Sequence, residues 1–130
     1  MKRKMITALT AILVFLAGCS ATPADKENTF KTISAEEAYT MMNEQDVLIV
    51  DVRTEEEYEQ GHIADAILIP NETITDSKPE QLPDQQAVIL VYCRSGNRSK
   101  QAAEKLVKMG YTHVLDFGGI RNWPYEIIKE

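Results

Sequence analysis

The residues best suited to chemistry lie in one short stretch, where Cys93 ends an apolar run and precedes a polar, basic loop. The run at 88–92 is typical of a buried strand, and a helical pattern begins at Ser99. A loop between a strand and a helix directs backbone N–H groups toward one point, which favours an anion there. A free cysteine has a pKa of about 8.5, and such surroundings favour its thiolate. We therefore predict that Cys93 is a nucleophile rather than a small core residue.

The loop after Cys93 supplies groups that can hold a small anion. Its backbone amides can stabilise a negatively charged sulfur, and Gly96 lets the chain turn tightly enough for them to converge. We assign Arg94 to the substrate, whereas Arg98 is left open between binding substrate and bracing the loop. The predicted substrate-binding residues are Arg94, Ser95, Gly96, Asn97, Arg98 and Ser99.

Four motifs in chain order resemble those of the rhodanese (sulfurtransferase) family, in particular its single-domain members. Each motif is weak alone, but four in this order, each at an expected strand or helix boundary, are specific. Together they span about residues 30–130. The motifs are Asp51-Val52-Arg53, Gly61-His62-Ile63, Cys93-Arg94-Ser95-Gly96-Asn97-Arg98-Ser99 and Gly118-Gly119-Ile120-Arg121-Asn122-Trp123.

The resemblance implies transfer of a sulfane sulfur in two covalent steps. The Cys93 thiolate would attack the outer sulfur of thiosulfate or a polysulfide, release sulfite or a shortened thiol, and keep the sulfur as a persulfide. A thiol, cyanide or a thiol protein would then accept that sulfur. No cofactor is implied.

Two other functions fit a reactive Cys93. The protein could be a persulfide carrier, or a binding partner of another sulfur or redox protein, that holds sulfur without turnover, and this alternative needs the same cysteine. A cysteine phosphatase is disfavoured, because such enzymes place five residues between cysteine and arginine whereas four separate Cys93 from Arg98. No aspartate near the loop offers an obvious general acid either.

The remaining motifs supply supporting residues for which structural roles compete. Asp51 and Arg53 could line the site, but we favour a structural ion pair that fixes a loop. For His62 we favour a hydrogen bond to the backbone over proton transfer. Gly118 and Gly119 either wall the pocket through close backbone approach or form an ordinary turn.

The N-terminus predicts export and lipid attachment. Three basic residues at 2–4 precede an apolar stretch at 5–15, which is shorter than the roughly 20 residues that span a bilayer. The sequence Leu16-Ala17-Gly18-Cys19 resembles the lipobox of bacterial lipoproteins, although an ordinary signal with an incidental cysteine is the alternative. The resemblance implies a signal peptide at 1–18, a lipidated Cys19 and an extracytoplasmic protein anchored to a bacterial membrane. Residues 19–29 are polar and predict a flexible tether.

Charge and composition exclude several partners. The formal net charge is −6, and loss of the three basic residues at 2–4 would bring it to −9. Such a protein has no electrostatic reason to bind nucleic acid or anionic lipid head groups, so its contact with the membrane would come from its own lipid anchor. If Cys19 is lipidated, no structural disulfide can form. Two histidines 51 positions apart, without a cysteine pair, do not make a zinc site, and we expect no metal.

Residues 30–130 are expected to form one α/β domain. Apolar runs alternate with helical patterns, which favours a five-stranded, mostly parallel sheet with helices on both faces, as in rhodaneses. Ligands of such sheets bind beyond the carboxyl ends of the strands, where Cys93 is placed. The expected strands are 30–33, 47–52, 66–69, 88–92 and 114–117, and the expected helices are 35–43, 54–60, 99–109 and 125–128.

Overall fold

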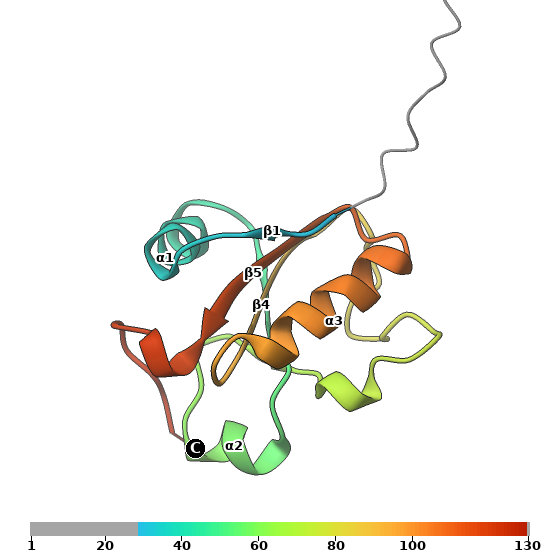
Figure 1. Cartoon of the computed structure of the whole chain (residues 1–130). Coiled ribbons are helices and arrows are strands. Elements are labelled where there is room, and N and C mark those ends of the chain that lie inside the picture. Colours follow the sequence, from blue (N-terminus) through green and yellow to red (C-terminus); the bar gives the residue numbers. More distant parts are fainter. Residues whose placement is uncertain (1–28, 130) are drawn as a thin grey trace, which may run out of the picture.

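The computed structural model describes residues 29–129, shown in colour in Figure 1. The predicted signal peptide, the predicted lipidation site Cys19 and residues 19–28 of the predicted tether lie outside the described residues. Within the described range, no helix has the length and apolar character that crossing a membrane requires.

A parallel β-sheet forms the centre of the domain. Its strands lie in the order β1-β5-β4-β2-β3, and every pairing between them is parallel. The central strand β4 is hydrogen-bonded to β2 on one side and to β5 on the other. The predicted five-stranded parallel α/β sheet is therefore confirmed. The strands are β1 (Lys31–Thr32), β2 (Leu48–Asp51), β3 (Ile67–Leu68), β4 (Val88–Cys93) and β5 (His113–Gly119).

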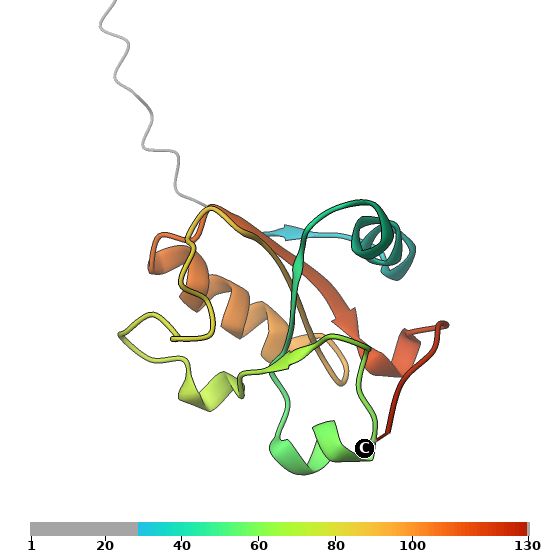
Figure 2. The same ribbon diagram turned by 180° about the vertical axis from the view of Figure 1, so that it is seen from behind.

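Helices cover both faces of the sheet, as Figures 1 and 2 show from opposite sides. Helix α1 (Ala35–Glu44) packs on one face and α3 (Asn97–Lys108) on the other, while the short α2 (Glu55–Gln60) lies near the carboxyl ends of the strands. Two single turns of 3₁₀ helix, η1 (Asn71–Thr73) and η2 (Ile120–Asn122), complete the described elements. Both α1 and α2 begin with a capping box, with Ser34 and Thr54 as their N-caps.

Strand β4 directs the side chain of Cys93 toward α3. Successive side chains of a strand point to opposite faces. Accordingly Ile89, Val91 and Cys93 belong to the core beneath α3, and Leu90 and Tyr92 to the core beneath α1. Cys93 is thus the last residue of a buried central strand and lies directly below the start of α3.

Two local predictions were wrong near the candidate site. Of the two roles left open for Gly118 and Gly119, the ordinary turn is wrong, because β5 continues through them and Cys93 is paired with Gly119. Helix α3 begins at Asn97 instead of Ser99, because Gly96 adopts a left-handed conformation (φ 104°) that ends the loop two residues earlier.

The predicted helix at 125–128 is also wrong. This segment is extended, and Ile128 forms an isolated antiparallel bridge with His62 through two backbone hydrogen bonds of 2.8 and 2.9 Å. A run of four residues is too short for periodicity to distinguish a helix from an extended segment. The bridge returns the chain to the end of α2, beside the Cys93 loop.

Candidate active site

The Cys93 thiol is enclosed by the loop that follows it. Its side chain is 1% exposed, and Sγ accepts a hydrogen bond of 3.0 Å from the Gly96 N–H. The Ser99 hydroxyl oxygen lies 3.6 Å from Sγ. Burial by itself raises the pKa of Cys93, but hydrogen bonds from the Ser99 hydroxyl and from the amides of Ser99, Gly96 and Ser95 lower it, and their effect is larger. The loop therefore favours a thiolate on Cys93.

The sharp turn at Gly96 leaves the N-terminus of α3 facing the thiol. The left-handed φ of 104° at Gly96 is readily reached only without a side chain. No side chain among residues 29–129 caps α3, so its first N–H groups are available to an anion. The same arrangement that stabilises a Cys93 thiolate can stabilise a negatively charged sulfur attached to it.

The carboxyl end of β5 supports this loop from below. Gly119 packs so closely that a Cβ atom there would lie 2.6 Å from Ser95 Cα and closer still to the Arg94 carbonyl group. Two residues further on, the Arg121 N–H donates to the Arg94 carbonyl oxygen at 3.2 Å. Gly119 therefore makes a close backbone approach, the first of the two roles considered for it.

Arg98 connects the loop to α2. Its two terminal nitrogens donate to the two carboxylate oxygens of Glu57 at 2.7 and 2.9 Å. The hydrogen bonds from Arg98 are the main reason why the pKa of Glu57 is lowered to about 2. Of the two roles left open for Arg98, the geometry corresponds to bracing the loop.

A buried polar network lies beneath the site. Asp51 and Arg53 form the ion pair that the sequence favoured, with Arg53 Nη2 2.7 Å from Asp51 Oδ2. The Tyr92 hydroxyl donates to the same oxygen at 2.7 Å, and Arg53 also donates to the Gly61 carbonyl oxygen at 2.7 Å. The network holds the start of α2 and the chain at Gly61 against the end of β4.

His62 is buried next to Gly61, which takes part in this network. Its side chain is 1% exposed, and Nδ1 lies 2.9 Å from the Tyr58 carbonyl oxygen. The imidazole also stacks on the Tyr58 ring at a centroid distance of 3.6 Å. The predicted hydrogen bond from His62 to the backbone is confirmed.

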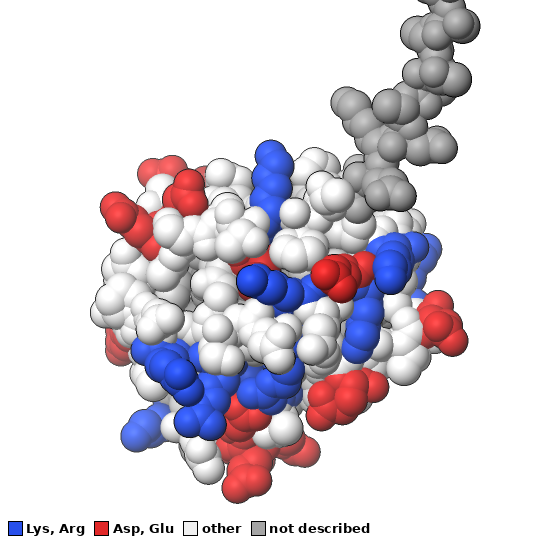
Figure 3. Space-filling view, in the orientation of Figure 1, with Lys and Arg blue, Asp and Glu red and all other residues white. Residues whose placement is uncertain are grey.

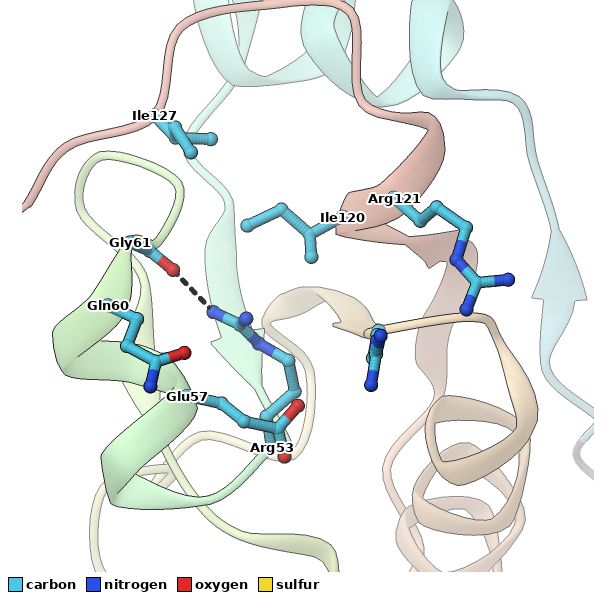
Figure 4. A pocket seen from close by; sticks show the side chains of 8 residues that line it. Arg53, Glu57, Gln60, Gly61, Ile120, Arg121 and Ile127 are labelled. Atoms are coloured by element: carbon cyan, nitrogen blue, oxygen red, sulfur yellow. Dashed lines mark hydrogen bonds between the residues drawn. The ribbon is translucent and has the colours of Figure 1, made fainter.

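A pocket of about 460 Å³ lies against the Cys93 loop (Figure 4). Arg94 lines it directly, and another lining residue, Glu57, holds Arg98 at the end of the loop. Figure 4 shows that α2, η2 and the segment carrying Ile127 surround the space. The lining residues are Arg53, Glu57, Gln60, Gly61, Arg94, Ile120, Arg121 and Ile127.

The structure divides the predicted substrate-binding residues into groups. Arg94 faces the pocket, and Gly96 and Ser99 contact the sulfur. Ser95 contributes an amide toward Cys93, whereas Asn97 is exposed and lines no part of this pocket.

The pocket also contains residues that the sequence did not identify. Arg121 and Ile120 lie within the motif at 118–123, but nothing about their residue types or spacing indicated that they would line the pocket. Ile127 was assigned to a helix that does not form. Among residues 29–129, no group of three or more histidine, cysteine or acidic side chains is arranged to hold a metal ion.

Comparison with known proteins places this geometry in context. A family model described as the rhodanese-like domain matches residues 34–125. The thiosulfate sulfurtransferase PspE of Escherichia coli (strain K12) is 41% identical over 80 residues, which is 62% of this chain and 77% of that protein. A sulfurtransferase of Allochromatium vinosum is 46% identical over 80 residues, covering 61% and 73% respectively.

Solved structures agree with the sequence relatives. A rhodanese-like domain protein from Staphylococcus aureus is 33% identical, with a TM-score of 0.66 over 78% of this chain and 99% of that chain. A rhodanese from E. coli, solved with anions, is 36% identical, with a TM-score of 0.60 over 65% of this chain and 100% of that chain.

Proposed function

This chain belongs to the rhodanese-like domain family and is a sulfurtransferase, and we propose that it moves sulfane sulfur from thiosulfate or a polysulfide as a persulfide on Cys93. The acceptor is a thiol, cyanide or a thiol protein. The observation that carries the proposal is the enclosure of Cys93, which is 1% exposed and whose Sγ accepts a hydrogen bond of 3.0 Å from the Gly96 N–H. Two similar proteins are named as sulfurtransferases, and the E. coli protein is named for thiosulfate.

The first step is a displacement at sulfur. The Cys93 thiolate attacks the outer sulfur of thiosulfate, a new S–S bond forms, and sulfite leaves with the electrons of the broken bond. The charge that develops on the transferred sulfur lies at the N-terminus of α3, where uncapped N–H groups can donate hydrogen bonds to it. Arg94, exposed at the pocket, can meet the oxygens of the leaving sulfite.

The second step returns the enzyme to its starting state. An acceptor thiolate attacks the outer sulfur of the protonated persulfide, and Cys93 leaves as the thiolate that the loop stabilises. The same amides therefore serve both halves of the reaction. Two successive displacements at one cysteine predict ping-pong kinetics.

We also propose that the protein works outside the cytoplasm and is anchored to a bacterial membrane through a lipid on Cys19. The support is the sequence at the N-terminus, where a basic segment and a short apolar stretch precede Leu16-Ala17-Gly18-Cys19. The polar tether would keep the domain close to the membrane.

Intact mass measurement tests the persulfide directly. The chain from Ser20 onward contains every described strand and helix, and it is weighed before and after incubation with thiosulfate, beside the Cys93→Ser variant. We expect a gain of one sulfur atom that a thiol or cyanide removes and that the variant lacks. No gain from either thiosulfate or a polysulfide would refute the proposal.

Turnover separates an enzyme from a carrier. We expect repeated transfer from thiosulfate to cyanide, and Cys93→Ser should retain less than about a thousandth of the wild-type rate. Loading of one sulfur without further turnover would instead identify a persulfide carrier.

A further inference from the structure

We propose that the pocket beside the Cys93 loop binds an organic thiol bearing a carboxylate as the sulfur acceptor, and that Arg94 and Arg121 select it by charge. This inference rests on the proposed function, because the acceptor is the second substrate of the same cysteine. It adds Arg121, Ile120 and Ile127 to the residues that determine the acceptor specificity of the enzyme.

Two of the four charged side chains lining the pocket are already neutralised. Arg53 is paired with Asp51 at 2.7 Å, and Glu57 is paired with Arg98 at 2.7 Å. The other two, Arg94 and Arg121, are exposed and make no side-chain hydrogen bond or ion pair with any residue in the described range. The pocket therefore presents two uncompensated positive charges.

These two arginines are held next to each other by the backbone. The Arg121 N–H donates to the Arg94 carbonyl oxygen, and the close packing of Gly119 fixes β5 against the loop. In Figure 4 the Arg121 side chain extends from η2 toward the Cys93 loop. Figure 3 shows basic side chains gathered over η2 and this loop, beside the acidic surface of α2. In a chain of net charge −6, this is a local site of attraction for anions.

Another side of the same pocket is apolar. Ile120 and Ile127 line it, and Ile127 is 42% exposed. Thiosulfate and cyanide have no apolar part that could use such a wall. The pocket volume of about 460 Å³ lies in the range of sites for small organic ligands. An organic thiol with a short apolar stem and a carboxylate can contact the two isoleucines and the two arginines at the same time.

The transfer balances without any further reactant. The acceptor thiolate forms a bond to the outer sulfur of the protonated persulfide, and the bond from that sulfur to Cys93 Sγ breaks. The electron pair leaves on Sγ, and the proton stays on the transferred sulfur. The products are an organic persulfide and the Cys93 thiolate, so no external oxidant or reductant is consumed.

A matched pair of acceptors tests the selection. Protein loaded with one sulfur from thiosulfate is discharged by 3-mercaptopropionate or by its neutral amide, and rates are compared at equal thiolate concentration. We expect kcat/KM to be about tenfold higher for the carboxylate, as for a charge-assisted hydrogen bond. Arg121→Gln should lower this ratio without abolishing it, because Arg94 remains, while Lys108→Gln, an equal charge change at the exposed far end of α3, should leave it unchanged.

The apolar wall has its own variant. Ile127→Ala should lower kcat/KM for both acceptors by a similar factor and leave their ratio intact, because it removes contact with the shared stem. Equal rates for the two acceptors in the wild-type protein, or an unchanged ratio in Arg121→Gln, would overturn the inference. Failure to load sulfur from both thiosulfate and a polysulfide would overturn the proposed function instead, so the two failures are distinct.

Discussion

The packing of Gly119 against the Cys93 loop predicts that the smallest possible substitution there disrupts catalysis. Gly119 has extended backbone angles (φ −121°, ψ 148°) that any residue can adopt, so Gly119→Ala adds no backbone strain. The added Cβ, however, would meet Ser95 Cα at 2.6 Å and the Arg94 carbonyl group more closely. Because these are backbone atoms, no side-chain rotation relieves the clash, and the loop itself must move.

The size of the effect follows from this displacement. Real Cβ atoms keep at least 3.0 Å from such neighbours, so the Arg94 carbonyl must retreat by about 1 Å. Misplacement of a catalytic group by about 1 Å can lower the rate about 100-fold, which corresponds to about 2.7 kcal/mol of transition-state stabilisation. Overpacking should also lower the free energy of unfolding by about 1–3 kcal/mol. The assays are steady-state transfer from thiosulfate to cyanide and thermal unfolding.

Gly118→Ala is the matched control. A Cβ at Gly118 would meet nothing within 4 Å, but the φ of 90° is left-handed. The expected cost is therefore about 1–2 kcal/mol of stability from backbone strain, with a much smaller loss of activity. Gly119→Ala with more than a third of the wild-type kcat/KM would refute the reasoning. Equal activity losses in the two variants would refute it as well.

Three further predictions concern the thiolate, the brace and the anchor. Ser99→Ala should raise the pKa of Cys93, because the hydroxyl lowers it now, and the rate of sulfur loading plotted against pH should shift to higher pH. At neutral pH, Glu57→Gln should lower the free energy of unfolding by about 1 kcal/mol. Since the folded pKa of Glu57 is about 2, the stability from its pair with Arg98 is present above its ordinary pKa and is lost as pH falls toward 2. Urea unfolding should therefore show less acid sensitivity in Glu57→Gln than in wild type over that range. Cys19→Ser should release the protein from membranes, and unchanged partitioning would contradict lipidation.

Much of the fold was predictable because its determinants are local. The apolar run ending at Cys93 is continuous, and a run of that length bounded by polar residues indicates a buried strand. Ser34 and Thr54 each precede a glutamate by three residues, a spacing typical of a capping box, and both form one. Alternation of strands and helices then favoured a parallel sheet.

The closing segment was not predictable in the same way. Ile127 and Ile128 lie in a short apolar run with no periodicity to read, and their extended conformation depends on a bridge to His62, 66 positions earlier in the chain. A contact over such a separation leaves no mark on the local pattern. The sequence left the role of Gly119 open for a similar reason, because its close approach is to the backbone of Arg94, which follows the neighbouring strand.

The sequence alone identified the candidate nucleophile and its immediate surroundings. Cys93, the strand before it and the loop after it are neighbours in the chain, so their chemistry can be read from order and residue type. Tertiary structure decided the use of the other charges: it paired Arg98 with Glu57 and, among the described residues, left Arg121 beside Arg94 without a side-chain partner. The reason is that an arginine's role depends on which carboxylate lies within a few ångströms, and in the pair of Arg98 with Glu57 that partner comes from a distant part of the chain.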